Sequence, residues 1–140
     1  MTRRALFAAP AVAVLARADA AADVWELLVK MAAALAEDNV SGFLDAIDPK
    51  MPGFDQLSAD VNGMIQQSEV RSIIEKLGDS GDDHARSLQL DWFLQMKRRG
   101  AGDRTLERRQ IIRCDAALQG KRWRVVRLEP IQFFAPPDFQ

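Results

Sequence analysis

The chain has 140 residues, of which 48% are hydrophobic and 28% are charged, with 19 basic and 20 acidic side chains. That length fits one domain with its own buried core, and this composition argues against a disordered chain. A net charge of −1 argues against a dedicated nucleic-acid-binding protein, so no nucleic acid is expected as a partner. The single cysteine excludes an intrachain disulfide and a multi-cysteine metal site, and we expect no metal and no cofactor.

The first twenty residues have the three-part pattern of an export signal. Residues 1–4 are basic, residues 5–16 are uncharged and almost wholly apolar, and Ala18 and Ala20 are small residues of the kind that a signal peptidase reads. The sequence TRRALF at residues 2–7 also resembles a bacterial twin-arginine signal. As a helix the apolar stretch is about 18 Å long, which is too short for a hydrocarbon core of roughly 30 Å, so no membrane span is expected.

This pattern predicts cleavage after Ala20, a single mature domain over residues 21–140, and a location in the bacterial periplasm or outside the cell. The alternative is that residues 1–20 begin the first helix of the domain itself.

Three helices are predicted next. Residues 23–37 place apolar side chains three or four residues apart on one face. Asn39 can cap a second, short helix, and Pro52 and Gly53 separate it from a third helix that ends near Gln67. Each helix has one apolar face, which indicates a helical layer packed against another layer.

From residue 69 onward apolar and polar residues alternate, which is typical of half-buried strands. The alternation predicts four strands separated by turns, over residues 70–77, 87–98, 106–118 and 122–131. Residues 78–83 are rich in glycine and aspartate and are expected to form the loop between the first two strands.

The facing of the fourth strand is ambiguous. Trp123 and Val125 lie on one side of the alternation, and Val126 and Leu128 lie on the other. Pro130 lacks a backbone N–H, so the strand is expected to lie at an edge of the sheet or to end there.

Helices followed by hairpin-connected strands predict an α+β domain, with three helices packed on a curved four-stranded antiparallel sheet that forms a cone. In this order of elements, residues 22–136 resemble the nuclear transport factor 2-like superfamily, which is also described as SnoaL-like or as a cystatin-like cone. Two local signatures support the resemblance: the acidic turn EDNV at residues 37–40, and the last strand GKRWRVV at residues 120–126. The resemblance implies either an isomerase, dehydratase or hydrolase, or a non-enzymatic binding or assembly module.

Asp91 is the one acid that we consider as a weak catalytic candidate. Family enzymes similar to ketosteroid isomerase or scytalone dehydratase use a carboxylate or histidine base and often tyrosine donors. This chain has no tyrosine, and its one histidine, His84, falls in a predicted turn. Asp91 alternates with inward-facing residues, which favours a solvated carboxylate paired with Arg109 or Arg113, whereas a shift of one residue would bury it and raise its pKa.

The other polar groups have structural interpretations. Cys114 falls on the inner face, where a thiol behaves as a small hydrophobic group. The aspartates at positions 79, 82 and 83 lack the spacing and the glutamate of a calcium loop. The last two strands are rich in arginine, which favours a solvated outer face with acidic cross-strand partners and leaves an anion site as the alternative; the arginines are Arg108, Arg109, Arg113, Arg122, Arg124 and Arg127.

Phe93 and Ile111 are apolar residues on the otherwise polar face of neighbouring strands. Two such residues can begin an exposed apolar patch. We therefore expect a homodimer through the outer face of the sheet.

The function expected from the sequence is that of an exported, non-catalytic domain that binds a small apolar ligand or a partner protein through the cone. One alternative is an enzyme of the isomerase, dehydratase or hydrolase type with an acid inside the cone, namely Asp91, Asp45 or Asp48. The other is a periplasmic assembly or scaffold subunit. The expected pocket residues are the inward-facing apolar side chains Leu28, Met31, Phe43, Leu90, Trp92, Leu94, Ile112 and Val125.

Overall fold

The computed structural model describes residues 2–100 and 102–139, and for residues 2–17 it describes the course of the helix alone. Three α-helices come first, namely α1 (Thr2–Ala36), α2 (Val40–Asp45) and α3 (Phe54–Gln67). The strands β1 (Ser68–Gly81), β2 (Ala85–Arg98), β3 (Thr105–Gln119) and β4 (Arg122–Glu129) follow, and then a short 3-10 helix, η1 (Ile131–Phe134). The strands form one antiparallel sheet in the order β1-β2-β3-β4, which confirms the expected α+β class.

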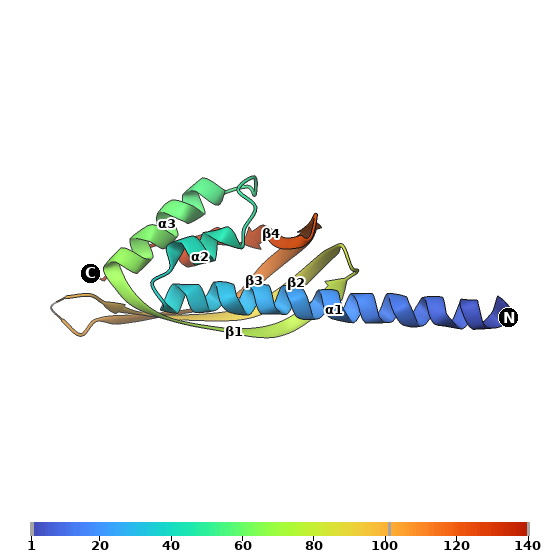
Figure 1. Cartoon of the computed structure of the whole chain (residues 1–140). Coiled ribbons are helices and arrows are strands. Elements are labelled where there is room, and N and C mark those ends of the chain that lie inside the picture. Colours follow the sequence, from blue (N-terminus) through green and yellow to red (C-terminus); the bar gives the residue numbers. More distant parts are fainter. Residues whose placement is uncertain (1, 101, 140) are drawn as a thin grey trace.

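The three helices cover one face of the sheet, which we call the inner face. The sheet curves beneath α1, and α2 and α3 lie on the same side (Figure 1). Of the residues that the helical spacing placed inward on α1 and α3, Leu27 and Phe54 are partly buried. The others are buried, namely Val24, Leu28, Met31, Leu35, Leu57, Val61, Met64 and Ile65. The opposite, outer face of the sheet is covered by no element of the described chain (Figure 1).

The predicted export signal lies in the first part of α1, with Met1 outside the described residues. α1 is continuous from Thr2, and its N-terminal end projects away from the rest of the domain (Figure 1). Ala18 is exposed, whereas Ala20 is buried in the core, so the packed domain begins at least one residue before the expected position 21. No helix in the described part of the chain combines the length and the apolarity that a membrane crossing needs.

The turns between the helices follow from local hydrogen bonds. Asp38 adopts a left-handed conformation with φ of 58°, and the backbone N–H of Asn39 donates to the carbonyl of Ala34, which ends α1. Asn39 then caps α2 as expected, because its side-chain oxygen accepts a hydrogen bond from the backbone N–H of Gly42 at 2.9 Å.

The largest difference from the predicted strands lies at the connection between β1 and β2. The predicted loop over residues 78–83 is wrong, because β1 continues to Gly81 and β2 begins at Ala85, two residues earlier than expected. A bulge between Lys76 and Gly78 leaves Leu77 without a partner, and β1 stays paired with β2 beyond it, from Gly78 to Gly81. Glycine and aspartate signal a turn in the sequence, but here the ladder with β2 is strong enough to extend the strand through them.

A second bulge, between Asp115 and Ala116, resolves the facing of β4. Trp123 and Val125 point to the inner face before the bulge, and Leu128 points to the same face after it. β4 is an edge strand that ends at Glu129, before Pro130 and not at residue 131 as predicted. Its free edge is covered in part by the segment after α2, where Val125 exchanges backbone hydrogen bonds with Ala46 and Asp48.

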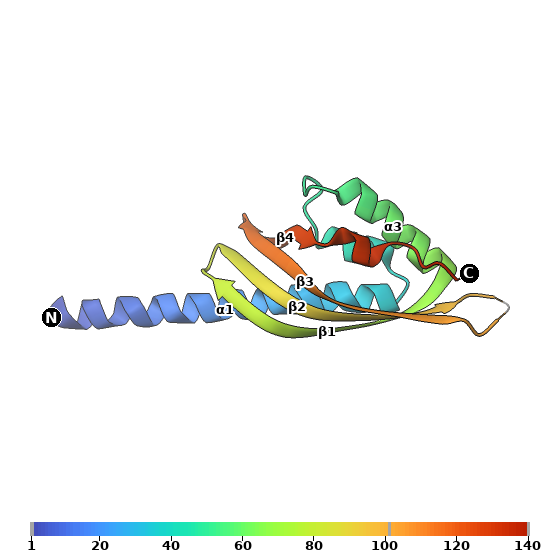
Figure 2. The same ribbon diagram turned by 180° about the vertical axis from the view of Figure 1, so that it is seen from behind.

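The chain after β4 was not assigned a structure from the sequence. We call residues 131–139 the C-terminal segment. It leaves the sheet after Pro130, forms η1 and then runs extended along α3 towards the β2–β3 hairpin (Figure 2).

Candidate functional site

The eight expected pocket residues come together in one hydrophobic core between the helices and the inner face. α1 and α2 contribute three of them, and β2, β3 and β4 contribute the other five. Each has an exposed fraction of 0% or 1%; they are Leu28, Met31, Phe43, Leu90, Trp92, Leu94, Ile112 and Val125.

Two aromatic side chains that the sequence analysis did not include fill the centre of this core. Phe133 and Phe134 of η1 are buried, and the ring of Phe134 lies 5.0 Å from that of Trp92 and 5.5 Å from that of Phe43. Phe133 packs edge-on against Phe134 at 5.1 Å. The interior therefore holds an aromatic cluster supplied by the C-terminal segment. The signal for it in the sequence is a pair of phenylalanines directly after the last strand.

The polar groups of the interior either have a hydrogen-bond partner, as Trp92 has, or are uncharged, as the thiol of Cys114 is. The indole N–H of Trp92 donates to the hydroxyl of Ser72 at 3.0 Å. Cys114 is fully buried, and its burial raises the pKa of the thiol far above its usual value, so the reactive thiolate does not form near neutral pH. Among the described residues, the buried polar or charged residues are Ser68 and Arg86, and neither is an acid.

Asp91 lies on the outer face of the sheet. The Arg109 guanidinium donates to both of its carboxylate oxygens, with the shortest contact at 2.6 Å. These hydrogen bonds lower the pKa of the Asp91 carboxyl, so it stays ionised as an ion-pair partner. A general acid needs the opposite shift.

The other two acids of the enzyme alternative also lie outside the core, which corrects their expected position. Asp45 is exposed and binds Arg122 at 2.6 Å. Asp48 accepts hydrogen bonds from the backbone N–H of Lys50 and from the side chain of Gln119, and these bonds lower the pKa of its carboxyl. The alternation rule of strands does not apply to these residues, because Asp45 ends the short helix α2 and Asp48 lies in the loop after it.

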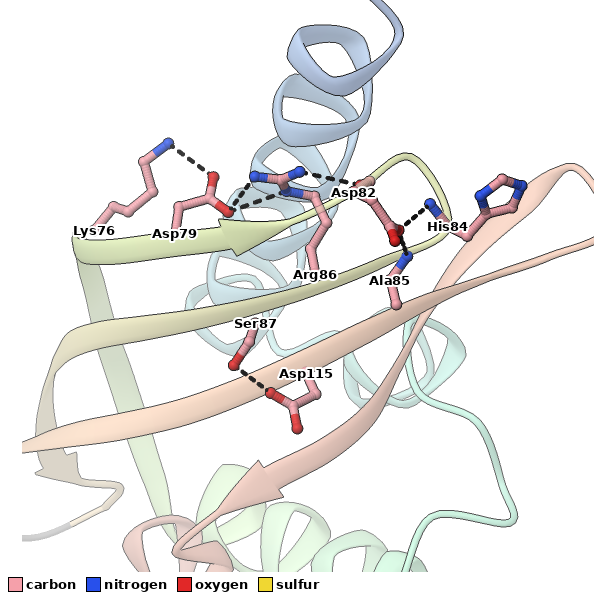
Figure 3. A network of polar contacts seen from close by, with 8 residues as sticks. All are labelled: Lys76, Asp79, Asp82, His84, Ala85, Arg86, Ser87 and Asp115. Atoms are coloured by element: carbon pink, nitrogen blue, oxygen red, sulfur yellow. Dashed lines mark hydrogen bonds and ion pairs between the residues drawn. The ribbon is translucent and has the colours of Figure 1, made fainter. Parts of the chain in front are cut away.

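A polar network closes the end of the sheet where β1 turns into β2 (Figure 3). Arg86 is buried and donates from two nitrogens to one oxygen of Asp79, at 2.9 and 3.0 Å, while Lys76 approaches the other oxygen at 3.6 Å. Asp82 accepts hydrogen bonds from the backbone N–H groups of His84 and Ala85. This arrangement fastens the turn.

His84 is exposed, as expected, and points away from the sheet (Figure 3). Its Nδ1 lies 2.8 Å from Asp83, and the ligand atoms of Asp82, Asp83 and His84 lie within 4.8 Å of one another. All three side chains are exposed, and Asp82 already closes the turn. We therefore assign the cluster a structural role.

The outer face carries a row of apolar side chains across three strands, which we call the outer patch: Ile73, Phe93 and Ile111. Ile73 lies directly opposite Phe93, and Ile111 is the diagonal neighbour of Phe93 on the next strand. Ile73 is 45% exposed and Ile111 is 58% exposed. Phe93 and Ile111 were expected on this face from the sequence. Ile73 was not, because the sequence did not establish which residues of the first strand face outward.

Next to the outer patch, small residues leave a hollow of about 370 Å³ at the end of the sheet. Arg113, two residues from Ile111 on the same face of β3, forms part of its lining. The hydroxyl of Ser87 donates to Asp115 at 2.7 Å on its wall (Figure 3).

The arginines divide into two groups. Arg109, Arg113 and Arg127 lie on the outer face in ion pairs with acids, as expected. Arg108 corrects the expectation, because it pairs across the ladder with buried Leu94 and therefore points to the inner face. There it donates to backbone carbonyls of the C-terminal segment and to no acid among the described residues.

No family model matches the chain, and no curated protein matches it. Several solved structures share its fold. A protein described as a candidate aromatic ring hydroxylase from Novosphingobium aromaticivorans aligns over 79% of this chain and 86% of its own, with a TM-score of 0.63 and 9% identity. A protein of unknown function from Mycobacterium tuberculosis aligns over 76% and 67%, with a TM-score of 0.61 and 10% identity.

A third structure, from Nostoc punctiforme, is described as having a cystatin-like fold and aligns over 76% of this chain and 85% of its own. Its TM-score is 0.55 and its identity is 12%. At these identities the likeness shows the fold alone. The fold is the cystatin-like arrangement of helices on a curved antiparallel sheet that the sequence predicted.

Proposed function

We propose that the protein is a non-catalytic binding domain that assembles with a second copy of itself through the outer face of its sheet. The observation that carries the proposal is the outer patch, because Ile73, Phe93 and Ile111 adjoin on a face that no other element covers. Apolar side chains fill the interior, and Asp45, Asp48 and Asp91 lie outside it, so the uncovered outer face is the surface best suited to binding.

The charges around the outer patch favour a second copy as the occupant. Arg71 and Glu75 lie two residues to either side of Ile73 on the same face of β1. Neither lies within ion-pair distance of an opposite charge among the described residues, although Glu75 is near enough to Arg109 to help raise the pKa of its guanidinium. A twofold axis across the strands at Ile73 places Arg71 of one protomer opposite Glu75 of its partner. The interface is then complementary to itself, as a symmetric dimer requires.

Light scattering at several protein concentrations tests this function. We expect the wild-type chain to have the mass of two chains at tens of micromolar, and Ile111→Glu to raise the dimer dissociation constant at least about tenfold, because a charge is buried in an apolar interface. Val29→Glu is the matched control, since Val29 is an exposed apolar residue on α1 that is 42% exposed. A wild-type chain that stays monomeric contradicts the proposal, and so does an equal effect of both substitutions.

A second function is favoured by the origin of the aromatic cluster. Phe133 and Phe134 belong to a segment that follows the sheet and is no part of its ladder. If the segment moves out, the cone offers an apolar space lined by the eight core residues to a small ligand. Native mass spectrometry of the protein purified from its own host tests this function, because a ligand carried in the interior is retained and is released on unfolding.

We further propose that the protein is exported, on the strength of the basic and apolar pattern of residues 1–16. Ala20 is buried and lies within α1, and cleavage after it needs that part of the helix to be unfolded. Cleavage before α1 packs against the sheet is therefore favoured, which fits export of an unfolded chain better than the twin-arginine route. N-terminal sequencing of the periplasmic protein checks this, and an N-terminus at Ala21 is expected.

A further inference from the structure

The C-terminal segment is held to the domain by side chains. Its own backbone hydrogen bonds, from Phe133 to Pro130 and from Ala135 to Gln132, are local, and no backbone hydrogen bond joins it to a strand within the described residues. Arg108 donates to the carbonyls of Phe133, Ala135 and Pro136, at 3.0, 2.5 and 3.2 Å. A segment that is fixed by side chains can leave without breaking the sheet.

Two glycines let this segment lie close to α3 and to the loop before it. A Cβ atom at Gly63 would lie 2.9 Å from the ring of Pro136, and one at Gly53 would lie 2.6 Å from the side chain of Ile131. Both distances are shorter than real side chains allow. The C-terminal segment can therefore pack this closely only because Gly53 and Gly63 have no side chains.

Arg108 differs from the other deeply placed arginine in its partners. Buried Arg86 is neutralised by the carboxylate of Asp79. Arg108 is partly buried, points to the inner face and has three neutral carbonyls in place of a carboxylate. Burial without a negative partner lowers the pKa of its guanidinium. A planar guanidinium in this position is suited to a carboxylate.

We propose that the space filled by Phe133 and Phe134 is a binding site for an aromatic carboxylic acid, whose rings replace those two side chains and whose carboxylate replaces the carbonyls on Arg108. The C-terminal segment is then an internal occupant that competes with the ligand. This inference rests on the second function above and adds the class of ligand and the residue that selects it.

The energetics of the exchange follow from this competition. Rings of the ligand replace rings of the segment against Trp92 and Phe43, so the apolar contacts are largely conserved. The gain comes from the carboxylate, since it brings a negative charge to Arg108 and can accept two parallel hydrogen bonds from the planar guanidinium, whereas the three carbonyls are neutral. The measured affinity is reduced by the small fraction of molecules in which the segment is out.

An NMR titration of the full-length protein with biphenylacetate tests the inference, with biphenylacetamide as the neutral counterpart of equal size. The indole N–H of Trp92 reports the interior, the Nε–H of Arg108 reports the carboxylate, and the N–H of Ala135 reports the segment. The proteins compared are the wild type, Phe134→Ala and Arg108→Gln. Arg109→Gln is the matched control, because Arg109 is the next residue and points to the outer face.

We expect the acid to bind more tightly than the amide, and Phe134→Ala to bind the acid at least about tenfold more tightly than the wild type, because the internal occupant is weakened. Arg108→Gln should weaken the acid about tenfold to a hundredfold and leave the amide unchanged. Arg109→Gln should change neither. If Phe134→Ala does not fold, Phe134→Leu takes its place with the same expected direction.

Two results would overturn the inference, and they are distinguishable. If acid and amide bind equally in every variant, Arg108 does not select a carboxylate, while the interior ligand site stands. If neither compound binds to a folded Phe134 variant, the interior ligand function fails together with the inference.

Discussion

Arg108 and Arg109 are adjacent on β3 and have opposite environments. Arg109 points outward and binds the Asp91 carboxylate, whereas Arg108 points inward and binds the carbonyls of the C-terminal segment. The alternation of a strand requires this difference. Both arginines were expected on the outer face, because charged side chains are usually exposed. Nothing in the sequence shows that the C-terminal segment supplies carbonyl acceptors for Arg108 on the inner face.

Asp91 and Cys114 show what alternation does predict. Asp91 alternates with the inward-facing residues of β2, so it was expected on the outer face, where it pairs with Arg109. Cys114 falls among the inward-facing residues of β3, so it was expected in the core, where it lies. Both follow from a period of two residues within long strands. Asp45 ends a helix of six residues and Asp48 lies in the loop after it, and their surroundings depend on contacts with β3 and β4 that are distant in sequence.

We predict that Cys114 is protected from thiol reagents in the folded protein. Its thiol is fully buried, and burial raises its pKa far above the value of 9.0 that it has when exposed. Reaction with a disulfide reagent at pH 8 should be slower than in denaturant by a factor of about a thousand or more, since it requires opening. Reaction at the same rate in both states would show that Cys114 is accessible.

The raised pKa of Cys114 also predicts how the free energy of unfolding changes with pH. The unfolded chain loses the Cys114 proton near pH 9 and the folded chain keeps it, so above that pH the unfolded state binds fewer protons. The contribution of Cys114 to the free energy of unfolding is complete below pH 9 and falls as the pH rises further. Cys114→Ala should remove this part of the alkaline dependence.

The helices and strands were predicted from the regular spacing of their apolar residues. The three helical faces and the pairing of four strands follow from spacings of three to four residues and of two residues. The facing of β4 could not be read, because β4 itself contains the bulge: Val126 has no partner on β3, and the alternation shifts by one residue between Val125 and Arg127. η1 has no period to detect, since four residues make little more than one turn of a 3-10 helix.

We predict that Gly63→Ala loosens the C-terminal segment. A Cβ atom at Gly63 meets the ring of Pro136, so the segment must shift, while alanine suits the interior of α3 better than glycine by about 1 kcal/mol. Hydrogen exchange should show faster exchange at the N–H of Ala135, with protection of the β2 amides unchanged. Unchanged exchange at Ala135, or loss of protection throughout the sheet, would contradict this prediction.

At the scale of the whole molecule, one sheet has two unlike faces. The inner face is closed by helices and by the aromatic cluster from the chain's end, and the outer face presents apolar residues among alternating charges. The order of elements could be read from the sequence, and so could two residues of the outer patch. The filling of the interior could not, because it depends on a segment that returns across the sheet after the last strand.

If two copies of the chain meet through the outer face, an exchange of the charges at Arg71 and Glu75 controls their association. Light scattering should show a dimer for the wild type, a monomer for Glu75→Arg, and a dimer again for the double variant Arg71→Glu with Glu75→Arg, because only the double exchange restores opposite charges across the twofold axis. A single exchange that leaves the dimer intact, or a double exchange that stays monomeric while folded, would contradict the account.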